Sequence, residues 1–404
     1  MAQAKGTGSI YKNSKGLWEV RVELPRGLDG KRRRKVVRRK SRSEAVALLR
    51  QLNKELAKAG DLATSSVTLE AWSEHWLKKR SEKLAPNTIN GYRTAFQEYI
   101  NPLLGKKRLD KITPTDVKHL HELILATPKD KALRGFSDPP EGTEMLSSTY
   151  SLLIHNSLSG ALKMAVREGK ISVNVCELVD RPTKRSTDEK ALTLEEAIKL
   201  LLHLAERANG PLWATYLLTG ARRGEVIGLE VNRVTDVLDL SWQIQRIKDI
   251  QSAPADYEYR HLEGNLYLVR PKSKAGWRTP PLVEPLATIL RRHIGDRTDG
   301  LVFLRDGRPW DPADASKEWK RLLQEVGLPS DVTLHGARHT VVDLLYEAGV
   351  PEPVIMEIVG HSTRAITRSY RSRGNQKIIR EALEKMSALF APSPAPLELE
   401  ELTT

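Results

Sequence analysis

The sequence predicts an α+β protein of several domains: a small three-stranded sheet with one helix, then a helical bundle, then a mainly helical domain with a small antiparallel sheet. Three observations support this. A chain of 404 residues is long for a single hydrophobic core. Its first 60 residues contain β-rich runs, whereas most later stretches have helical periodicity. Short polar segments at 60–66 and 180–188 separate these parts. We therefore predict domains at 1–62, 67–182 and 188–390, followed by an acidic tail at 391–404.

The composition indicates a soluble protein that binds a polyanion. Of the net charge of +14, most lies in the first 60 residues, which hold 17 Lys or Arg against 5 Asp or Glu. Nucleic acid is the commonest polyanionic partner of such a segment. No apolar run is long enough for a membrane span, and the first residues lack the apolar core of a signal peptide. Cys176 is the only cysteine, so no internal disulfide is expected, which fits a reducing cytoplasm.

Residues 1–62 carry signals for three strands and one helix. β-rich runs at 9–11 and 18–24 are separated by a turn sequence, and the basic run 31–42 alternates around two valines as a third strand. Ser43 is the predicted N-cap of a helix through Ala57. The basic run is read as a binding face for nucleic acid, with a merely solvated or disordered arm as the alternative.

Residues 67–182 are predicted to be helical. N-cap or proline signals begin four helices, at Thr68, Pro86, Thr113-Pro114 and Ser147 or Ser148. The tryptophans and tyrosines here are expected in the core rather than stacked on bases. The proline- and glycine-rich stretch 128–144 reads as a mobile loop to which no role is assigned.

Residues 188–390 begin with a capping box, Thr193 to Glu196, and are predicted to form helices around a short sheet. The predicted strands are 237–242, 266–270 and 278–282, and Asp306-Gly307 marks a further tight turn.

Six residues in this last domain occur in four short words that suit attack on a phosphodiester. Arg222 lies in LLTGARRGE, Lys274 in PKSKAGWR, His335 and Arg338 in HGARHT, and His361 and Tyr370 in GHSTRAITRSY. Guanidinium groups bind phosphate oxygens in pairs, and a phenol can serve as the nucleophile. Each residue taken singly is more often structural, but all of them occur together and in order. No two-metal carboxylate cluster and no nucleotide-binding loop is evident.

These words and their spacing resemble the tyrosine recombinase (phage integrase) family, in particular the three-domain integrases with an arm-type DNA-binding domain at the N-terminus. The resemblance covers 190–375 closely and the rest loosely. It implies that Arg222 and Arg338 hold the scissile phosphate while Tyr370 attacks it. His335 would accept the tyrosine proton and His361 would hydrogen-bond the phosphate. Lys274, on a β-hairpin, would protonate the leaving 5′ oxygen, although Lys272 could hold that role instead.

The resemblance further implies a site-specific recombinase that forms a 3′-phosphotyrosyl intermediate and a Holliday junction, without metal, ATP or other cofactor. Its expected partners are double-stranded DNA at core and arm-type sites, three further copies in a homotetramer, and an accessory DNA-bending protein or excision factor. The expected location is the cytoplasm or nucleoid of a bacterial host, and the expected role is integration or excision of a phage or mobile element. The apolar face of a helix at 375–389 is expected to dock on a neighbouring protomer.

Two alternatives stay open at this point. A type IB topoisomerase would share the phosphotyrosine chemistry but would relax supercoils as a monomer. A DNA-binding architectural protein would use the fold without cutting. The separate basic N-terminal segment argues against the first, and the intact set of six residues argues against the second. The amino-acid sequence does not reveal the DNA sequences of the attachment sites.

Overall fold

The computed structural model describes residues 8–24, 32–59, 67–134, 138–184, 190–270, 277–360 and 373–390. The chain divides into two compact units, one of residues 1–186 with 252–254 and one of residues 187–251 with 255–404. Helices predominate and the sheets are small and antiparallel, so the predicted α+β, multi-domain class is confirmed. None of the helices in the described ranges is long and apolar enough to cross a membrane.

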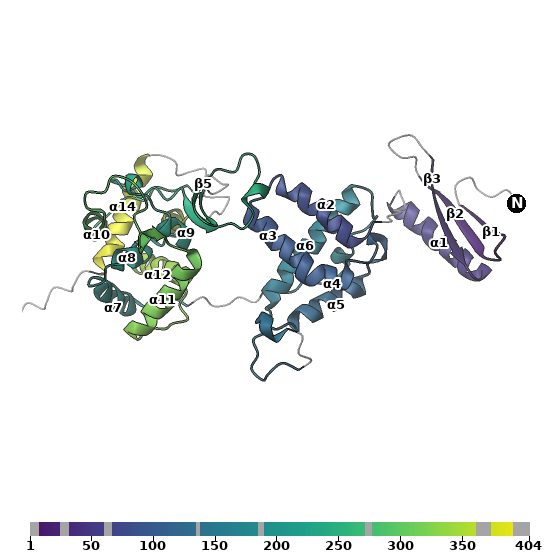
Figure 1. The fold of residues 1–404 in the computed structure, drawn as a ribbon, viewed down its shortest axis with the longest axis horizontal. Coiled ribbons are helices and arrows are strands. Elements are labelled where there is room, and N and C mark those ends of the chain that lie inside the picture. The colour runs from purple at the N-terminus through teal and green to yellow at the C-terminus, as the bar shows by residue number, and fades with distance from the viewer. Residues whose placement is uncertain are drawn as a thin grey trace, which may run out of the picture. The chain divides into compact units, whose positions relative to one another are not determined.

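The described residues before position 60 form a three-stranded antiparallel sheet covered by one helix (Figure 1). The elements are β1 Ser9–Lys12, β2 Trp18–Leu24, β3 Arg33–Arg39 and α1 Arg42–Ala59. Val20 and Val22 are fully buried and form a core with Ala45 of α1. The predicted strands and helix are confirmed, but Ser41 rather than Ser43 caps the helix, because its hydroxyl accepts the Glu44 N–H at 3.2 Å.

The same sheet holds a carboxylate among its basic residues. Glu19 accepts hydrogen bonds from Tyr11, from Arg38 Nε at 3.0 Å and from Arg21 Nε at 2.9 Å. These bonds lower the pKa of Glu19 to about 2. Arg38 and Arg21 remain partly exposed, so this contact orders the guanidinium groups without removing them from the surface.

Residues 67–184 fold into a helical bundle (Figure 1). Its helices are α2 Leu69–Ser81, α3 Pro86–Ala95, η1 Phe96–Ile100, α4 Asn101–Leu104, η2 Leu109–Lys111, α5 Pro114–Leu125, η3 Lys131–Leu133, α6 Ser148–Arg167 and η4 Val175–Leu178. The predicted starts are confirmed: Thr68, Thr113 and Ser147 accept backbone N–H groups as N-caps, and Pro86 is the first residue of α3. Trp72 and Trp76 are buried in the core, as predicted.

The stretch between α5 and α6 is held at both ends. Lys129 N–H donates to the carbonyl of Glu144 at 2.8 Å, and Pro128 bridges to Met145. Lys131 and Arg134 both pair with Glu98 of η1, and Arg134 lies over the ring of Tyr99. These contacts fix where the stretch leaves and rejoins the bundle, and its function stays unassigned.

A pair of histidines inside this bundle predicts lower stability in mild acid. His121 Nε2 lies 3.0 Å from Nδ1 of His155, which is 1% exposed. Burial, with His121 and Arg181 nearby, lowers the pKa of His155 to about 4 from 6.5. The unfolded chain therefore binds more protons between those two values, so stability should fall as pH drops from about 6.5 towards 4. Thermal unfolding of the full chain at pH 7.5 and 5 checks this. A smaller drop is expected for His155→Gln, and equal drops in both proteins would contradict it.

The described residues of 190–390 (190–270, 277–360 and 373–390) form helices around a small sheet of order β4-β6-β5. The helices are α7 Leu194–Leu204, α8 Gly210–Thr219, α9 Arg223–Ile227, η5 Val231–Arg233, η6 Ile250–Ser252, α10 Leu286–Ile294, α11 Pro312–Val326, α12 Leu334–Glu347, α13 Glu352–Val359 and α14 Arg373–Ala388, and the strands are β4 Gln243–Arg246, β5 Tyr259–Glu263, β6 Leu266–Val269, β7 Leu304–Arg305 and β8 Arg308–Pro309. Trp213 on α8 is completely buried and contacts the rings of Trp310 and Trp319. The capping box at Thr193 and the turn at Asp306-Gly307 are confirmed.

Two of the three strands predicted for this sheet are wrong. Of the three, only the strand predicted at 266–270 is present, as β6 Leu266–Val269. The stretches 237–242 and 278–282 are joined by one isolated bridge, from Val237 to Pro281. Leu238 and Leu240 donate to the carbonyls of Pro280 and Arg278, but two consecutive prolines lack the N–H groups that a ladder requires. The partners of 266–269 are instead β4 and β5, which the sequence analysis did not identify.

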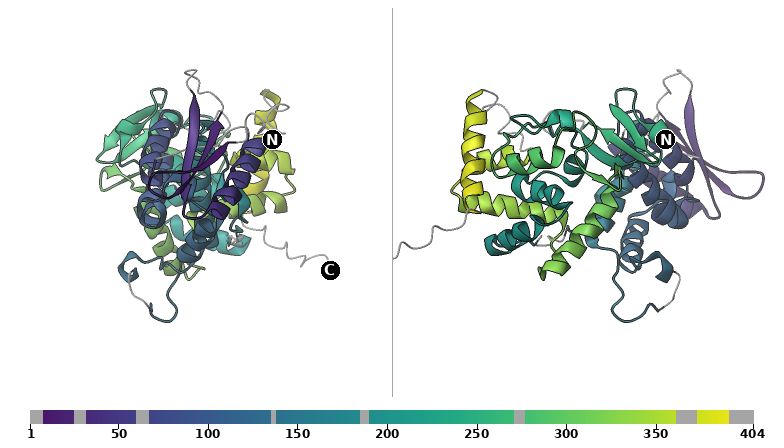
Figure 2. Two further views of the ribbon diagram at one scale, coloured as in Figure 1. Left: turned by 90° about the vertical axis from the view of Figure 1, so that its right-hand side faces the viewer. Right: turned by 60° about the vertical axis from the view of Figure 1, so that its left-hand side comes forward.

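The final helix packs within its own unit. Ile379, Leu383 and Met386 of α14 are buried against α12 and α13, and Figure 2 shows α14 (yellow) running beside the green helices of the same unit. Ile378, on the same predicted apolar face, is 42% exposed. Docking of this helix on a neighbouring protomer therefore stays a prediction.

Candidate active site

Arg222 is placed by a sharp turn between two helices. Helix α8 ends at Gly220, which has a left-handed backbone with φ of 59°. A Cβ at Gly220 would lie 3.2 Å from the side chain of Val341, so both conformation and space favour glycine. Arg222 is the N-cap residue of α9, and its side chain is 40% exposed. Its Nη2 donates to the carbonyl of Gly360 at 2.9 Å, which leaves part of the guanidinium open to a ligand.

Glu225 orients Arg222 through two contacts. Its carboxylate accepts the backbone N–H of Arg222 at 2.7 Å and Nη1 of the same residue at 2.9 Å. Glu225 is 1% exposed, so these bonds are shielded from water. The acid thus holds both the main chain and the side chain of the arginine, as the one-turn spacing of the two residues allows.

Arg338 reaches the same place from α12 and is 2% exposed. Nη1 donates to the carbonyl of Gly220 at 2.8 Å, and Nη2 donates to the carbonyl of Val359. Its Nε is buried and has no hydrogen-bond partner among the described residues. Burial and then repulsion from Arg278 and Arg222 lower the pKa of Arg338 to about 9. A buried cation with an unused donor is well suited to accept an anion.

His335 stands one turn before Arg338, in the first turn of α12. Thr333 caps this helix by accepting the N–H groups of His335 and Gly336. The His335 side chain is exposed, and its ring lies 5.2 Å from that of His339 in an edge-on arrangement. A Cβ at Gly336 would lie 2.4 Å from the carbonyl of Lys190, so glycine allows this helix start to approach the chain before α7.

Arg278 belongs to the same cluster, although the sequence analysis placed it only in a strand. Its side chain is 7% exposed and pairs with Glu225 through Nη2 at 2.7 Å and Nη1 at 3.3 Å. An arginine beside apolar and proline residues in a stretch expected to be buried requires a counter-ion. This need for a counter-ion was the only sign in the sequence that Arg278 belongs to a charged cluster, and it does not reveal that Glu225 is the partner.

Four residues considered for the site lie outside the described residues: Lys272, Lys274, His361 and Tyr370. Their roles stay predictions. Described residues next to these four do contact the cluster. Gly360, which precedes His361, accepts a hydrogen bond from Arg222. Arg278, which follows the segment with both lysines, pairs with Glu225. Arg222 and Arg338, 116 positions apart in the sequence, both donate to carbonyls at the end of α13, so the structure does bring these two together.

The cluster contains three guanidinium groups, from Arg222, Arg278 and Arg338, and one carboxylate, from Glu225. Its formal charge is therefore positive by two, in a setting that largely excludes water. Such a site can bind a phosphate and stabilise the extra negative charge of a pentacoordinate transition state. The described residues include no group of three acidic, histidine or cysteine side chains arranged to hold a metal ion.

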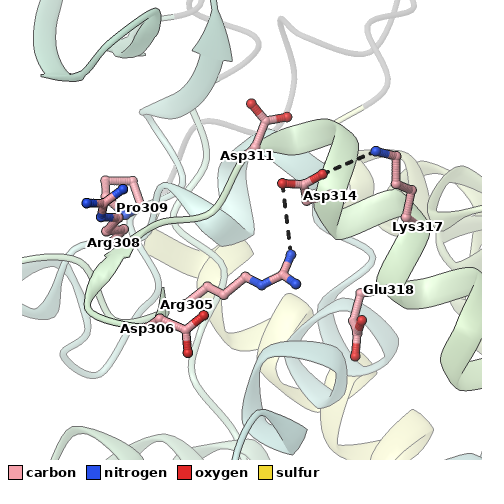
Figure 3. A pocket seen from close by; sticks show the side chains of 8 residues that line it. All are labelled: Arg305, Asp306, Arg308, Pro309, Asp311, Asp314, Lys317 and Glu318. Carbon is pink, nitrogen blue, oxygen red and sulfur yellow. Dashed lines mark hydrogen bonds and ion pairs between the residues drawn. The ribbon is translucent and has the colours of Figure 1, made fainter.

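A separate cleft of about 600 Å³ lies between the β7–β8 hairpin and α11 (Figure 3). Its charges are mixed: Asp314 pairs with Lys317 at 3.4 Å and with Arg305 at 3.9 Å. Neither Arg222, His335 nor Arg338 lines it. The size of this cleft therefore gives no ground for placing the predicted chemistry there.

Comparison with family models gives two matches. Residues 192–377 match the phage integrase family, and residues 68–122 match the N-terminal SAM-like domain of phage integrases. An integrase of Saccharopolyspora erythraea is 26% identical over 90% of this chain and 92% of its own length. A XerC-like tyrosine recombinase of Caldanaerobacter subterraneus is 25% identical over 96% of this chain and its whole length.

Solved structures show the same fold. The Tn1549 transposon integrase in complex with transposon right end DNA superposes with a TM-score of 0.58 at 20% identity, covering 80% of this chain and all of that one. A lambda integrase dimer bound to a core site gives a TM-score of 0.54 at 18% identity, over 92% and 97% of the two chains. The lambda integrase tetramer bound to a Holliday junction gives 0.51 at 17% identity, over 90% and 98%.

Proposed function

The chain belongs to the phage integrase family of tyrosine recombinases, and we propose that it integrates or excises a phage or mobile element by cutting and rejoining DNA at specific sites. The observation that carries this proposal is the cationic cluster. Arg222 and Arg338 come from distant segments, meet at the end of α13, and retain donors that no described residue uses fully. A scissile phosphate would complete their hydrogen bonding.

The proposed reaction is a transesterification. Arg222 and Arg338 bind the non-bridging oxygens while the oxygen of Tyr370 attacks phosphorus and the bond to the 5′ oxygen breaks. His335 takes the phenolic proton, and Lys274 (or Lys272) gives a proton to the leaving oxygen. His361 hydrogen-bonds the phosphate. One ester replaces another of similar energy, so the 5′ hydroxyl of a second duplex can reverse the step without a nucleotide or a metal.

The proposed assembly is a homotetramer that holds two duplexes and passes through a Holliday junction. The tetrameric lambda integrase on such a junction supports this by its fold. The basic sheet of β1, β2 and β3 supports a second DNA contact at arm-type sites, since strands can enter the major groove while arginines hold phosphates. An accessory DNA-bending protein or excision factor would bring the two kinds of site together.

The test is to trap and sequence the DNA that becomes attached to the protein. A library of nicked duplexes, in which the cleaved strand loses a short fragment and cannot be rejoined, is incubated with the full chain. We expect one core sequence joined through its 3′ phosphate to Tyr370, and recombinant products when two copies of that site are supplied. Relaxation of a supercoiled plasmid without such sites, together with no recombinants, would instead favour a topoisomerase. DNA binding without any covalent product would favour an architectural protein.

A further inference from the structure

We propose that Arg278 is a positioning residue for DNA cleavage: it neutralises Glu225, so that Glu225 can orient Arg222 without cancelling the charge that Arg222 offers to the phosphate. This inference rests on the proposed function. It assigns to Arg278 a part in the reaction that the six-residue set does not include.

Arg222 and Arg278 share the carboxylate of Glu225. Glu225 accepts four hydrogen bonds, two from Arg222 and two from Arg278, with its two oxygens each serving both arginines. The Arg278–Glu225 pair is the more deeply buried, at 7% and 1% exposure, whereas the Arg222 side chain is 40% exposed. The carboxylate is therefore balanced from the buried side by Arg278, and Arg222 faces the side from which a ligand can approach.

Arg278 also packs closely against the end of α13. A Cβ added at Gly360 would lie 2.8 Å from Nη1 of Arg278 and 3.3 Å from its Cδ, so the arginine lies directly on the Gly360 backbone. The Gly360 carbonyl is also an acceptor for Arg222. The Arg278 carbonyl is fixed in turn by the N–H of Leu240 at 3.1 Å. Arg278 thus ties together the start of α9, the end of α13 and the chain that follows residue 276.

Arg278 also acts electrostatically on the other charged groups of the cluster. Arg278 ranks ahead of Arg222 as the charge that opposes ionisation of Arg338. Burial, and then the neighbouring Arg222, lower the pKa of Arg278, while Glu225 raises it. If Arg278 were neutral, Glu225 would have only Arg222 as a direct counter-ion, and in this poorly hydrated place the pair would offset each other strongly. The positive charge presented to DNA would then decrease although every residue of the predicted six was intact.

The experiment measures single-turnover covalent cleavage of a nicked core-site duplex by the full chain, alongside the affinity for the same DNA. For Arg278→Met we expect cleavage to slow on the order of 100-fold, because an unbalanced Glu225 would offset most of the charge that Arg222 offers to the transition state. Affinity should change by less than about threefold, because the many other phosphate contacts supply most of it. Arg278→Lys retains the charge but not the two-pronged contact, so it should cleave faster than Arg278→Met.

The double variant Glu225→Gln/Arg278→Met separates this role from a purely structural one. It removes the uncompensated carboxylate, so cleavage should recover at least about tenfold over Arg278→Met alone, a coupling expected only of residues that act through each other. A double variant no faster than Arg278→Met, or equal rates for the Lys and Met variants, would overturn the proposal. So would a wild-type cleavage rate for Arg278→Met.

Arg233→Met is the matched control. Arg233 lies in the same unit, is 19% exposed on its side chain and pairs with Glu230 at 2.8 Å and Asp239 at 3.1 Å. The Arg233→Met variant should lose about as much thermal stability as Arg278→Met, yet cleave at the wild-type rate per folded molecule. If both variants cleaved equally slowly, Arg278 would be only a structural ion-pair residue. If Arg278→Met does not fold, the Lys variant and the double variant are compared with wild type instead. Failure of the wild-type protein to form any covalent complex would contradict the proposed function, whereas the outcomes above concern Arg278 alone.

Discussion

Tyr370→Phe is expected to abolish covalent capture of DNA while leaving DNA binding intact. The substitution removes only the phenolic oxygen, so shape and apolar contacts are preserved and the nucleophile is lost. A phenol with a pKa of about 10 requires a base as it attacks, and phenylalanine has no proton to give and no oxygen to form the ester. The expected loss is on the order of 10⁴-fold or more, because no neighbouring group can substitute for a covalent nucleophile.

Denaturing gels after incubation with a nicked core site measure this directly, and a filter or gel-shift assay reports binding. Tyr346→Phe is the control, because Tyr346 lies on α12 of the same unit and is 50% exposed. It should cleave like the wild-type protein. Covalent capture by Tyr370→Phe at the wild-type level would falsify the assignment of the nucleophile, and loss of capture in Tyr346→Phe alone would transfer that role.

Arg338→Met is expected to lower the cleavage rate by about 10²–10³-fold, equivalent to roughly 2.7–4 kcal/mol of transition-state stabilisation. The guanidinium is buried and spans from Gly220 to Val359, so its loss also leaves two carbonyl groups without donors. A second, structural effect on unfolding is therefore expected. Arg338→Lys should remain slow, since one ammonium cannot reproduce the two-pronged geometry.

Single-turnover cleavage and thermal unfolding, measured on the same samples, separate the two effects of Arg338→Met. Arg292→Met serves for comparison, because Arg292 is an exposed arginine on α10 of the same unit. That variant should lose neither stability nor cleavage rate to a comparable degree. If Arg338→Met were folded and cleaved within about threefold of wild type, the assignment of Arg338 to the phosphate would be untenable.

Local signals correctly located the starts of several helices. Thr68, Thr113, Ser147 and Thr193 were identified as N-caps because a side-chain oxygen at a fixed short spacing from a free N–H needs no tertiary information. The prediction of strands at 237–242 and 278–282 was wrong because strand pairing, unlike capping, does depend on tertiary information. Their residue types suit a sheet, but pairing depends on a remote partner, and Pro280-Pro281 cannot donate to a ladder.

By itself the sequence determined the reaction class, DNA strand breakage and rejoining. The motifs that contain the arginines, histidines and tyrosine occur in the order typical of that chemistry, and this order can be recognised without knowing how the chain packs. The sequence also determined that Arg222 and Glu225, and His335 and Arg338, lie within one helical turn of each other. Only the tertiary structure decided that Arg222 and Arg338 meet at the carbonyls of α13, that Arg278 shares Glu225 with Arg222, and that α14 covers its own unit. The physical reason is the distance between the partners along the sequence. Arg278 and Glu225 are 53 residues apart, so their pairing leaves no pattern in either local sequence. Which partners meet is decided by the burial of side chains in the folded domain and by the free-energy cost of leaving a buried charge unpaired.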